Sequence, residues 1–245
     1  VCRRGEENLC VKPCSVGIHR AGGFATHLIV PHPRYLFDIE GIAPERAAPL
    51  ACSGVTAFSA LKKAADTLKD EPVVMIGAGG VGLMAVGLHA KMGGKAVVMV
   101  EIDPAKREAA LKAGATHVID GRAPDVLDQV RAATGGGAWA VIDFVGAGQT
   151  VKLGVDATIK GGKVIVVGLF GCDVTVATPF FPIKALTVQG SYVGSLGEIA
   201  ELIELVKAKG APDVPVATRP LEKVNAALND LREGKVVGRV VMTPA

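Results

Sequence analysis

The chain has 245 residues, of which 49% are hydrophobic, 21% charged and 4% aromatic, and its net charge is +3. This length allows one large domain or two small ones, and either can bury a hydrophobic core. The small, dispersed charge argues against a nucleic-acid or membrane-surface partner, and no apolar run reaches the roughly 18 residues of a membrane span. No signal peptide is recognisable, so we expect a cytoplasmic protein.

The first twenty residues are rich in cysteine, glycine and proline, which predicts irregular structure. Three of the five cysteines, Cys2, Cys10 and Cys14, lie within this segment, and the others are Cys52 and Cys172. An odd number of cysteines crowded in this way is unlike a secreted disulfide framework and favours a metal site. Because a valine precedes Cys2, we expect the chain to start in the middle of a motif.

Residues 24–30 read as a short strand, and residues 42–68 read as mostly helical. The apolar run at residues 73–76 predicts a buried strand, and residues 83–92 carry a helical pattern. A glycine-rich turn connects these last two elements.

This turn satisfies the pattern G-x-G-x-x-G with Gly77, Gly79 and Gly82. The three glycines allow a tight turn, a close approach of the backbone to a pyrophosphate, and close packing of the helix on the strand. The helix N-terminus supplies free N–H groups and a positive dipole end for the phosphates. An ordinary turn is the alternative, but the flanking strand and helix favour a dinucleotide site.

A second apolar run, at residues 96–100, ends in Glu101, about 20 residues after Gly82. A carboxylate at this position can accept the hydroxyl groups of a ribose. Because it would also repel a 2′-phosphate, Glu101 favours NAD over NADP.

Helices and strands then alternate along the chain. We expect helices at residues 104–113, 124–133 and 150–159, and strands at residues 117–119, 141–145, 164–167 and 186–189. Near-continuous apolar strands separated by helices predict an α/β fold of the Rossmann type, a doubly wound parallel sheet covered on both faces.

After Gly190 the pattern changes. Ser195 and Glu198 form a capping box that opens an amphipathic helix ending at Lys209. A second amphipathic helix is expected at residues 221–231 and a closing strand at residues 236–242. We expect this tail to return to the domain begun by the first fifty residues.

Four separated signatures make the chain resemble the zinc-dependent alcohol dehydrogenases of the medium-chain dehydrogenase/reductase family over essentially its whole length. They are the Cys2–Cys10 segment enclosing Gly-Glu-Glu-Asn-Leu, residues 51–57, the Gly77–Gly82 turn, and residues 190–194. The resemblance implies an NAD-binding Rossmann domain at residues 51–190. It also implies a partial, mostly β catalytic domain of the GroES-like type, formed by residues 1–50 with part of a structural-zinc lobe and by residues 191–245.

The resemblance implies two zinc sites that use cysteine thiolates. Cys2 and Cys10 match the third and fourth ligands of the structural zinc, and Cys52 matches the third protein ligand of the catalytic zinc. The remaining ligands of both sites are expected upstream of Val1. The alternatives are free thiols at Cys2 and Cys10 and a buried small residue at Cys52.

The resemblance also assigns residues to the cofactor. Lys106 is expected at the adenosine ribose, Thr56 at the nicotinamide and Arg239 at the pyrophosphate, although a solvated arginine at a strand edge is the alternative for Arg239. The complete expected set of cofactor-binding residues is Thr56, Gly77, Gly79, Gly80, Val81, Gly82, Glu101, Lys106, Val145, Gly168, Leu169 and Arg239. The expected catalytic residues are Cys52 and Thr56.

Other residues that could carry chemistry are given structural roles. The five histidines are scattered and form no H-E-x-x-H pattern. Asp143, inside a predicted strand, is expected to order a nearby loop, and Cys172 is interpreted as an incidental thiol.

The activity implied by the resemblance is NAD-dependent, zinc-assisted hydride transfer between a primary or secondary alcohol and its aldehyde or ketone. A homodimer or homotetramer is also implied, with the strand at residues 186–190 pairing across a two-fold axis. Two alternatives stay open: a catalytically incomplete NAD-binding fragment, and a zinc-free quinone or enoyl reductase of the same superfamily. The second is disfavoured by Cys2, Cys10 and Cys52, and by Glu101, because such reductases usually use NADPH.

Overall fold

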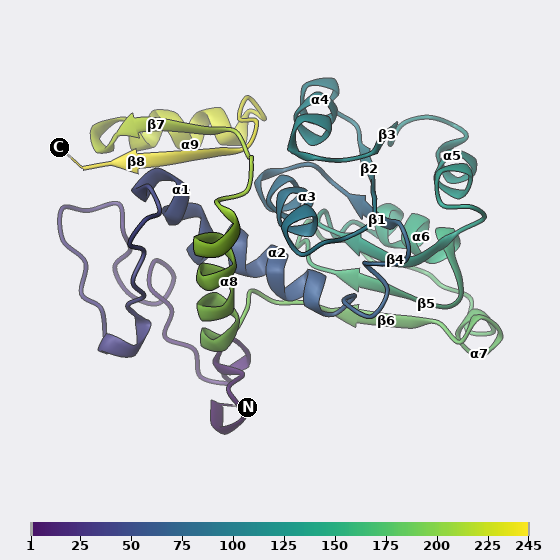
Figure 1. Ribbon diagram of the computed structural model, residues 1–245, viewed down its shortest axis with the longest axis horizontal. Helices are drawn as coiled ribbons and strands as arrows, with labels where there is room; N and C mark the ends of the chain where they lie inside the picture. Colours follow the sequence, from purple (N-terminus) through teal and green to yellow (C-terminus); the bar gives the residue numbers. More distant parts are fainter. Residues whose placement is uncertain (1, 245) are drawn as a thin grey trace.

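The fold was analysed in a computed structural model, which describes residues 2–244 (Figure 1). The α-helices are α1 (Pro44–Ala47), α2 (Ser53–Lys62), α3 (Gly80–Lys91), α4 (Pro104–Ala113), α5 (Val126–Ala133), α6 (Gly148–Ala157), α7 (Phe180–Lys184), α8 (Leu196–Lys209) and α9 (Val224–Arg232). The strands are β1 (Val73–Ile76), β2 (Val97–Glu101), β3 (His117–Asp120), β4 (Ala138–Asp143), β5 (Thr158–Val166), β6 (Thr187–Gly190), β7 (Val216–Pro220) and β8 (Arg239–Thr243). Short 3₁₀ helices are η1 (Cys2–Arg4), η2 (Glu7–Leu9), η3 (Pro33–Tyr35), η4 (Ala48–Ala51) and η5 (Leu221–Lys223).

Six strands form one sheet in the order β3-β2-β1-β4-β5-β6, and every neighbouring pair is parallel. The chain moves outward from β1 to β3 and then returns to the other side of β1 at β4. In such sheets the ligand site lies outside the carboxyl ends of the strands, where the strand order reverses. The predicted doubly wound parallel fold is therefore confirmed, and its reversal point lies between β1 and β4.

Alternate residues of β1 face two separate hydrophobic cores, as the period of two in a strand requires. Val73 and Met75 pack in the core that contains residues of α2, α3, α4 and α8. Val74 and Ile76 pack in the core that contains residues of α5 and α6. Both faces of the sheet are thus covered, as predicted.

Two predicted helix boundaries are confirmed at the level of individual hydrogen bonds. The carboxylate of Asp103 accepts the N–H of Ala105 at 2.8 Å at the start of α4, and Gly114 ends that helix in a left-handed conformation (φ 112°). In the predicted capping box of α8, Ser195 Oγ accepts the N–H of Glu198 at 3.2 Å, and Glu198 Oε2 accepts the N–H of Ser195 at 2.8 Å.

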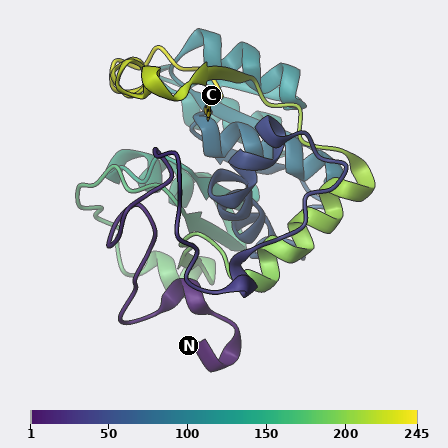
Figure 2. The ribbon, with the colours of Figure 1, turned by 90° about the vertical axis from the view of Figure 1, so that its left-hand side faces the viewer.

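The C-terminal residues build a second, smaller unit in which β7 and β8 pair in parallel and α9 connects them. Figure 1 shows this unit beside α1 and apart from the six-stranded sheet. In Figure 2 residues 2–40 run as loops with short 3₁₀ helices across the side turned to the viewer. No helix of residues 2–244 is both long and apolar enough to cross a membrane.

Several predicted elements need correction. Residues 24–30 are not a strand, because no other segment of residues 2–244 pairs with them. Residues 158–159 open β5 and do not extend a helix, since Thr158 already pairs with Ala138 of β4. Helix α7 and strand β7 were not predicted.

Candidate functional site

The glycine-rich turn lies at the reversal point of the sheet, between the end of β1 and the start of α3. Gly77 has a positive φ of 92°, which favours glycine. A Cβ on Gly82 would collide with the carbonyl oxygen of Gly77, so helix and turn pack too closely for any side chain there. A Cβ on Gly79 would meet no atom within 4 Å. The open space over Gly79, beside the N-terminus of α3, fits the pyrophosphate of a dinucleotide.

Arg239 reaches this turn from β8 in the C-terminal unit. A Cβ on Gly80 would lie 2.5 Å from Cδ and 2.8 Å from Nη1 of Arg239. The structure therefore brings together the N-terminus of α3 and a guanidinium from the other end of the chain, and both carry positive charge suited to a phosphate.

Glu101 lies at the end of β2 and is 8% exposed. Its Oε2 accepts the N–H of Ala78 at 2.7 Å, and its Oε1 accepts the N–H of Asp103 at 2.9 Å. A carboxylate has about four acceptor positions, so these two bonds fix its orientation and leave capacity for ribose hydroxyls.

A cleft of about 360 Å³ opens beside Glu101 and is lined by Lys106, Arg122 and Glu233 among others. Lys106 comes from the first turn of α4, Arg122 from the loop after β3, and Glu233 from the turn after α9. Glu101 links the cleft to the glycine-rich turn, since it lines the cleft and accepts the N–H of Ala78, and the sequence predicts the adenosine ribose at Glu101.

The ends of β4 and β5 form the other side of the site. Val145 packs so closely on Gly77 that a Cβ there would lie 2.6 Å from its Cγ2, and a Cβ on Gly168 would collide with the backbone of Val145. Leu169, next to Gly168, is 84% exposed. These residues therefore border the carboxyl edge of the sheet on the side away from Glu101.

Asp143 orders the loop that carries Val145. Its Oδ1 accepts the N–H groups of Val145 at 2.9 Å and Gly146 at 3.1 Å, and its Oδ2 accepts the hydroxyl of Thr150 at 2.7 Å. The side chain is fully buried, which agrees with the predicted structural role of this aspartate.

Cys52 and Thr56 lie at the start of α2, where the N–H of Thr56 donates to the carbonyl of Cys52 at 3.0 Å. Cys52 is exposed, so the alternative of a buried small residue is wrong. A structural zinc site needs four ligands and a catalytic one at least three from the protein. Residues 2–244 contain no group of three or more His, Cys, Asp or Glu side chains that could hold a metal ion. Cys52 alone therefore does not make a zinc site, and the same holds for Cys2 and Cys10, which are free thiols.

Some residues of the site were not predicted. Thr150 completes the loop around Asp143, and the backbone N–H of Ala78 is one of two donors to the Glu101 carboxylate. The only sequence signal for the role of Thr150 was a threonine shortly after a strand-end aspartate. Nothing in the sequence indicates the bond from Ala78 to Glu101, because a backbone amide is present at every position except proline.

The chain is similar in sequence and fold to known dehydrogenases. Residues 80–208 match the family described as zinc-binding dehydrogenase. The chain is 35% identical over 244 residues to an NAD-dependent alcohol dehydrogenase of Sulfurisphaera tokodaii, covering 99% of this chain and 70% of that protein. A second NAD-dependent alcohol dehydrogenase, of Saccharolobus solfataricus, is 36% identical with the same coverage. The crystal structure of the alcohol dehydrogenase of Aeropyrum pernix superposes with a TM-score of 0.85 at 33% identity, over 99% of this chain and 71% of that one.

Proposed function

The chain belongs to the zinc-binding dehydrogenase family of the medium-chain dehydrogenase/reductases, and on that basis we propose that it is an NAD-dependent alcohol dehydrogenase. It would interconvert a primary or secondary alcohol and its aldehyde or ketone. The observation that carries this proposal is the cradle around Gly79, with Arg239 over Gly80 on one side and Glu101 fixed on the other.

In this proposal the chain binds and orients the dinucleotide. The N–H groups at the start of α3 and the guanidinium of Arg239 bind the pyrophosphate, while Glu101 and Lys106 take the adenosine ribose. Val145, Gly168 and Leu169 then border the nicotinamide, with Thr56 packing on its ring. When bound, NAD supplies the hydride acceptor for the carbinol carbon. The contribution of the protein is to hold the two reactants in a fixed orientation.

We assign Cys52 the role of a catalytic zinc ligand, and Cys2 and Cys10 that of structural ligands, by resemblance to the family. The donors within residues 2–244 do not complete the ligand set of either ion.

The organisation of the molecule also stays a prediction. We propose that residues 1–50 and 191–245 form parts of one catalytic domain around the NAD-binding residues 51–190. We also propose a homodimer or homotetramer, paired through β6, which is an edge strand of the sheet with all four residues exposed. We also propose a cytoplasmic location.

Three measurements on the purified chain test the function. They are NAD binding by titration, alcohol-dependent formation of NADH, and the zinc-to-protein ratio. Binding with turnover, and a ratio of about two zinc ions, supports the whole proposal. Binding without turnover and without zinc would leave a dinucleotide-binding module, the first alternative. Absence of NAD binding would contradict the proposed function.

A further inference from the structure

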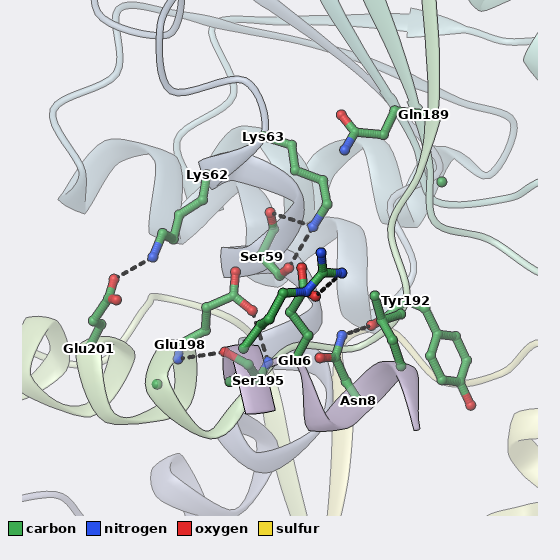
Figure 3. A pocket seen from close by; sticks show the side chains of 15 residues that line it. Glu6, Asn8, Ser59, Lys62, Lys63, Gln189, Tyr192, Ser195, Glu198 and Glu201 are labelled. Carbon is green, nitrogen blue, oxygen red and sulfur yellow. Dashed lines mark hydrogen bonds and ion pairs between the residues drawn. The ribbon is translucent and has the colours of Figure 1, made fainter. Parts of the chain in front are cut away.

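A second cavity, of about 410 Å³, lies where residues 4–9 meet α2 and the chain from β6 to α8 (Figure 3). None of the residues assigned to the dinucleotide lines it. Its volume is in the range of small-molecule sites, and most of the residues that line it are polar or charged.

Every acidic side chain of this cavity already has a partner. Glu201 pairs with Lys62 at 2.6 Å, and Glu6 pairs with Arg4 at 2.8 Å. Glu198 accepts the N–H of Ser195 in the capping box of α8. Glu6 and Glu201 are therefore neutralised by ion pairs, whereas Glu198 is hydrogen-bonded but keeps its negative charge.

Lys63 is the exception among the cations that line the cavity. It has no carboxylate within 4 Å in residues 2–244, whereas Lys62 and Arg4 each have one. Its Nζ donates to Ser59 Oγ at 2.8 Å and, less favourably, to Ser59 O at 3.4 Å. An ammonium group has three N–H donors, so at least one is left for a ligand.

The Lys63 side chain is partly removed from water. The side chain is half-buried, and desolvation lowers its pKa against the opposing effect of Glu198. A cation partly removed from water is stabilised by an anion in contact with it. The side-chain amide of Gln189, which has no hydrogen bond within residues 2–244, lies at the same end of the cavity in Figure 3.

We propose that this cavity binds a small oxyanion, a carboxylate or a phosphate, with the ammonium of Lys63 as its charged partner and the amide of Gln189 as a further donor. The ligand is distinct from the dinucleotide. It contacts the N-terminal residues, α2 and the segment from β6 to α8 at once.

The test is calorimetric titration of the full chain with inorganic phosphate and, separately, with succinate, each with and without saturating NAD. Saturation of the wild-type chain by either anion supports the proposal. The anion that binds shows whether the cavity takes a phosphate or a carboxylate. Lys63→Met keeps the aliphatic stem and should weaken that binding by at least about tenfold. The matched control is Lys112→Met, which removes an exposed lysine of α4 that pairs with Glu108, and it should bind like the wild type.

Gln189→Leu provides a second variant, at an exposed side chain of β6, and should also weaken binding. The proposal is overturned if neither anion binds, or if Lys63→Met binds like the wild type. It is equally overturned if NAD displaces the anion, because the anion would then occupy the glycine-rich turn.

Discussion

The carboxylate of Glu101 accepts the backbone N–H of Ala78 at 2.7 Å, so the end of β2 holds the glycine-rich turn in place. One side chain thus has two tasks, since the same carboxylate is the proposed partner of the adenosine ribose. Substitutions at this position should therefore affect both the geometry of the turn and the choice of cofactor.

We expect Glu101→Ala to weaken NAD binding by about 10- to 100-fold, as loss of hydrogen bonds to a charged group implies. NADP binding should fall less or improve, because the charge that repels the 2′-phosphate is gone. Titration with both cofactors measures the ratio of the two affinities. Unchanged affinities for both would contradict the ribose assignment.

Substitutions at two glycines of the same motif should affect different properties, NAD binding at Gly79 and stability at Gly82. Gly79 has an ordinary φ of −69° and open space around it, so Gly79→Val should fold normally but block the pyrophosphate. Gly82→Ala should instead destabilise the fold, since its methyl would collide with Gly77. Thermal unfolding and NAD titration separate the two effects. A Gly79→Val protein that binds NAD like the wild type would rule out this position for the pyrophosphate.

Arg239 should contribute charge more than packing. Arg239→Met keeps much of the stem over Gly80, so stability should change little while NAD affinity falls by about tenfold. Arg232→Met, at the exposed end of α9, is the matched control and should leave NAD affinity unchanged. Equal affinities for the two variants would favour the solvated-arginine interpretation.

The sequence was most informative where structure is local. The helix at residues 104–113 was predicted with its observed ends, because Pro104 begins it and Gly114 follows its last residue. The pairing of β7 with β8 depends on contact between segments about twenty residues apart, and no local signal indicates a parallel pair.

The same distinction holds at the site. The glycine motif and Glu101 could be identified from spacing, and the resemblance placed Arg239 at the turn. The bond from Ala78 to Glu101 and the cavity around Lys63 depend on tertiary packing, which spacing along the chain does not encode. The strand predicted at residues 24–30 was wrong for a related reason, since apolar residues form a strand only where a partner strand is available.

His89 should make stability depend on pH. Its ring is 2% exposed, packs against Gly94, and has an Nε2 with no hydrogen-bond partner in residues 2–244. Burial lowers the pKa of His89 from 6.5 to about 4. The unfolded chain therefore takes up a proton at a higher pH than the folded chain, so the stabilisation is present above pH 6.5 and is lost as the pH falls towards 4.

The expected loss is up to about 3 kcal/mol for this one group. Urea unfolding of the wild type and of His89→Leu at neutral pH and near pH 4.5 measures it. The variant should lose less stability than the wild type between these conditions. Identical losses would show that other groups control the acid sensitivity.

Lys91 and Lys209 cap each other's helices. Lys91 Nζ donates to the carbonyl of Lys209 at 2.9 Å, and Lys209 Nζ donates to the carbonyl of Lys91 at 2.6 Å. These residues end α3 and α8, so each ammonium meets the negative end of the other helix dipole.

Each lysine-to-alanine variant should lose about 0.5–1 kcal/mol of unfolding free energy, whereas Lys69→Ala, on an exposed turn, should lose almost none. Because alanine keeps the backbone carbonyl, either bond survives loss of the other, and the double variant should be additive within about 0.5 kcal/mol. A much larger coupling in urea unfolding would mean that the two bonds form as one unit, and no loss in either single variant would mean that the caps do not contribute to stability.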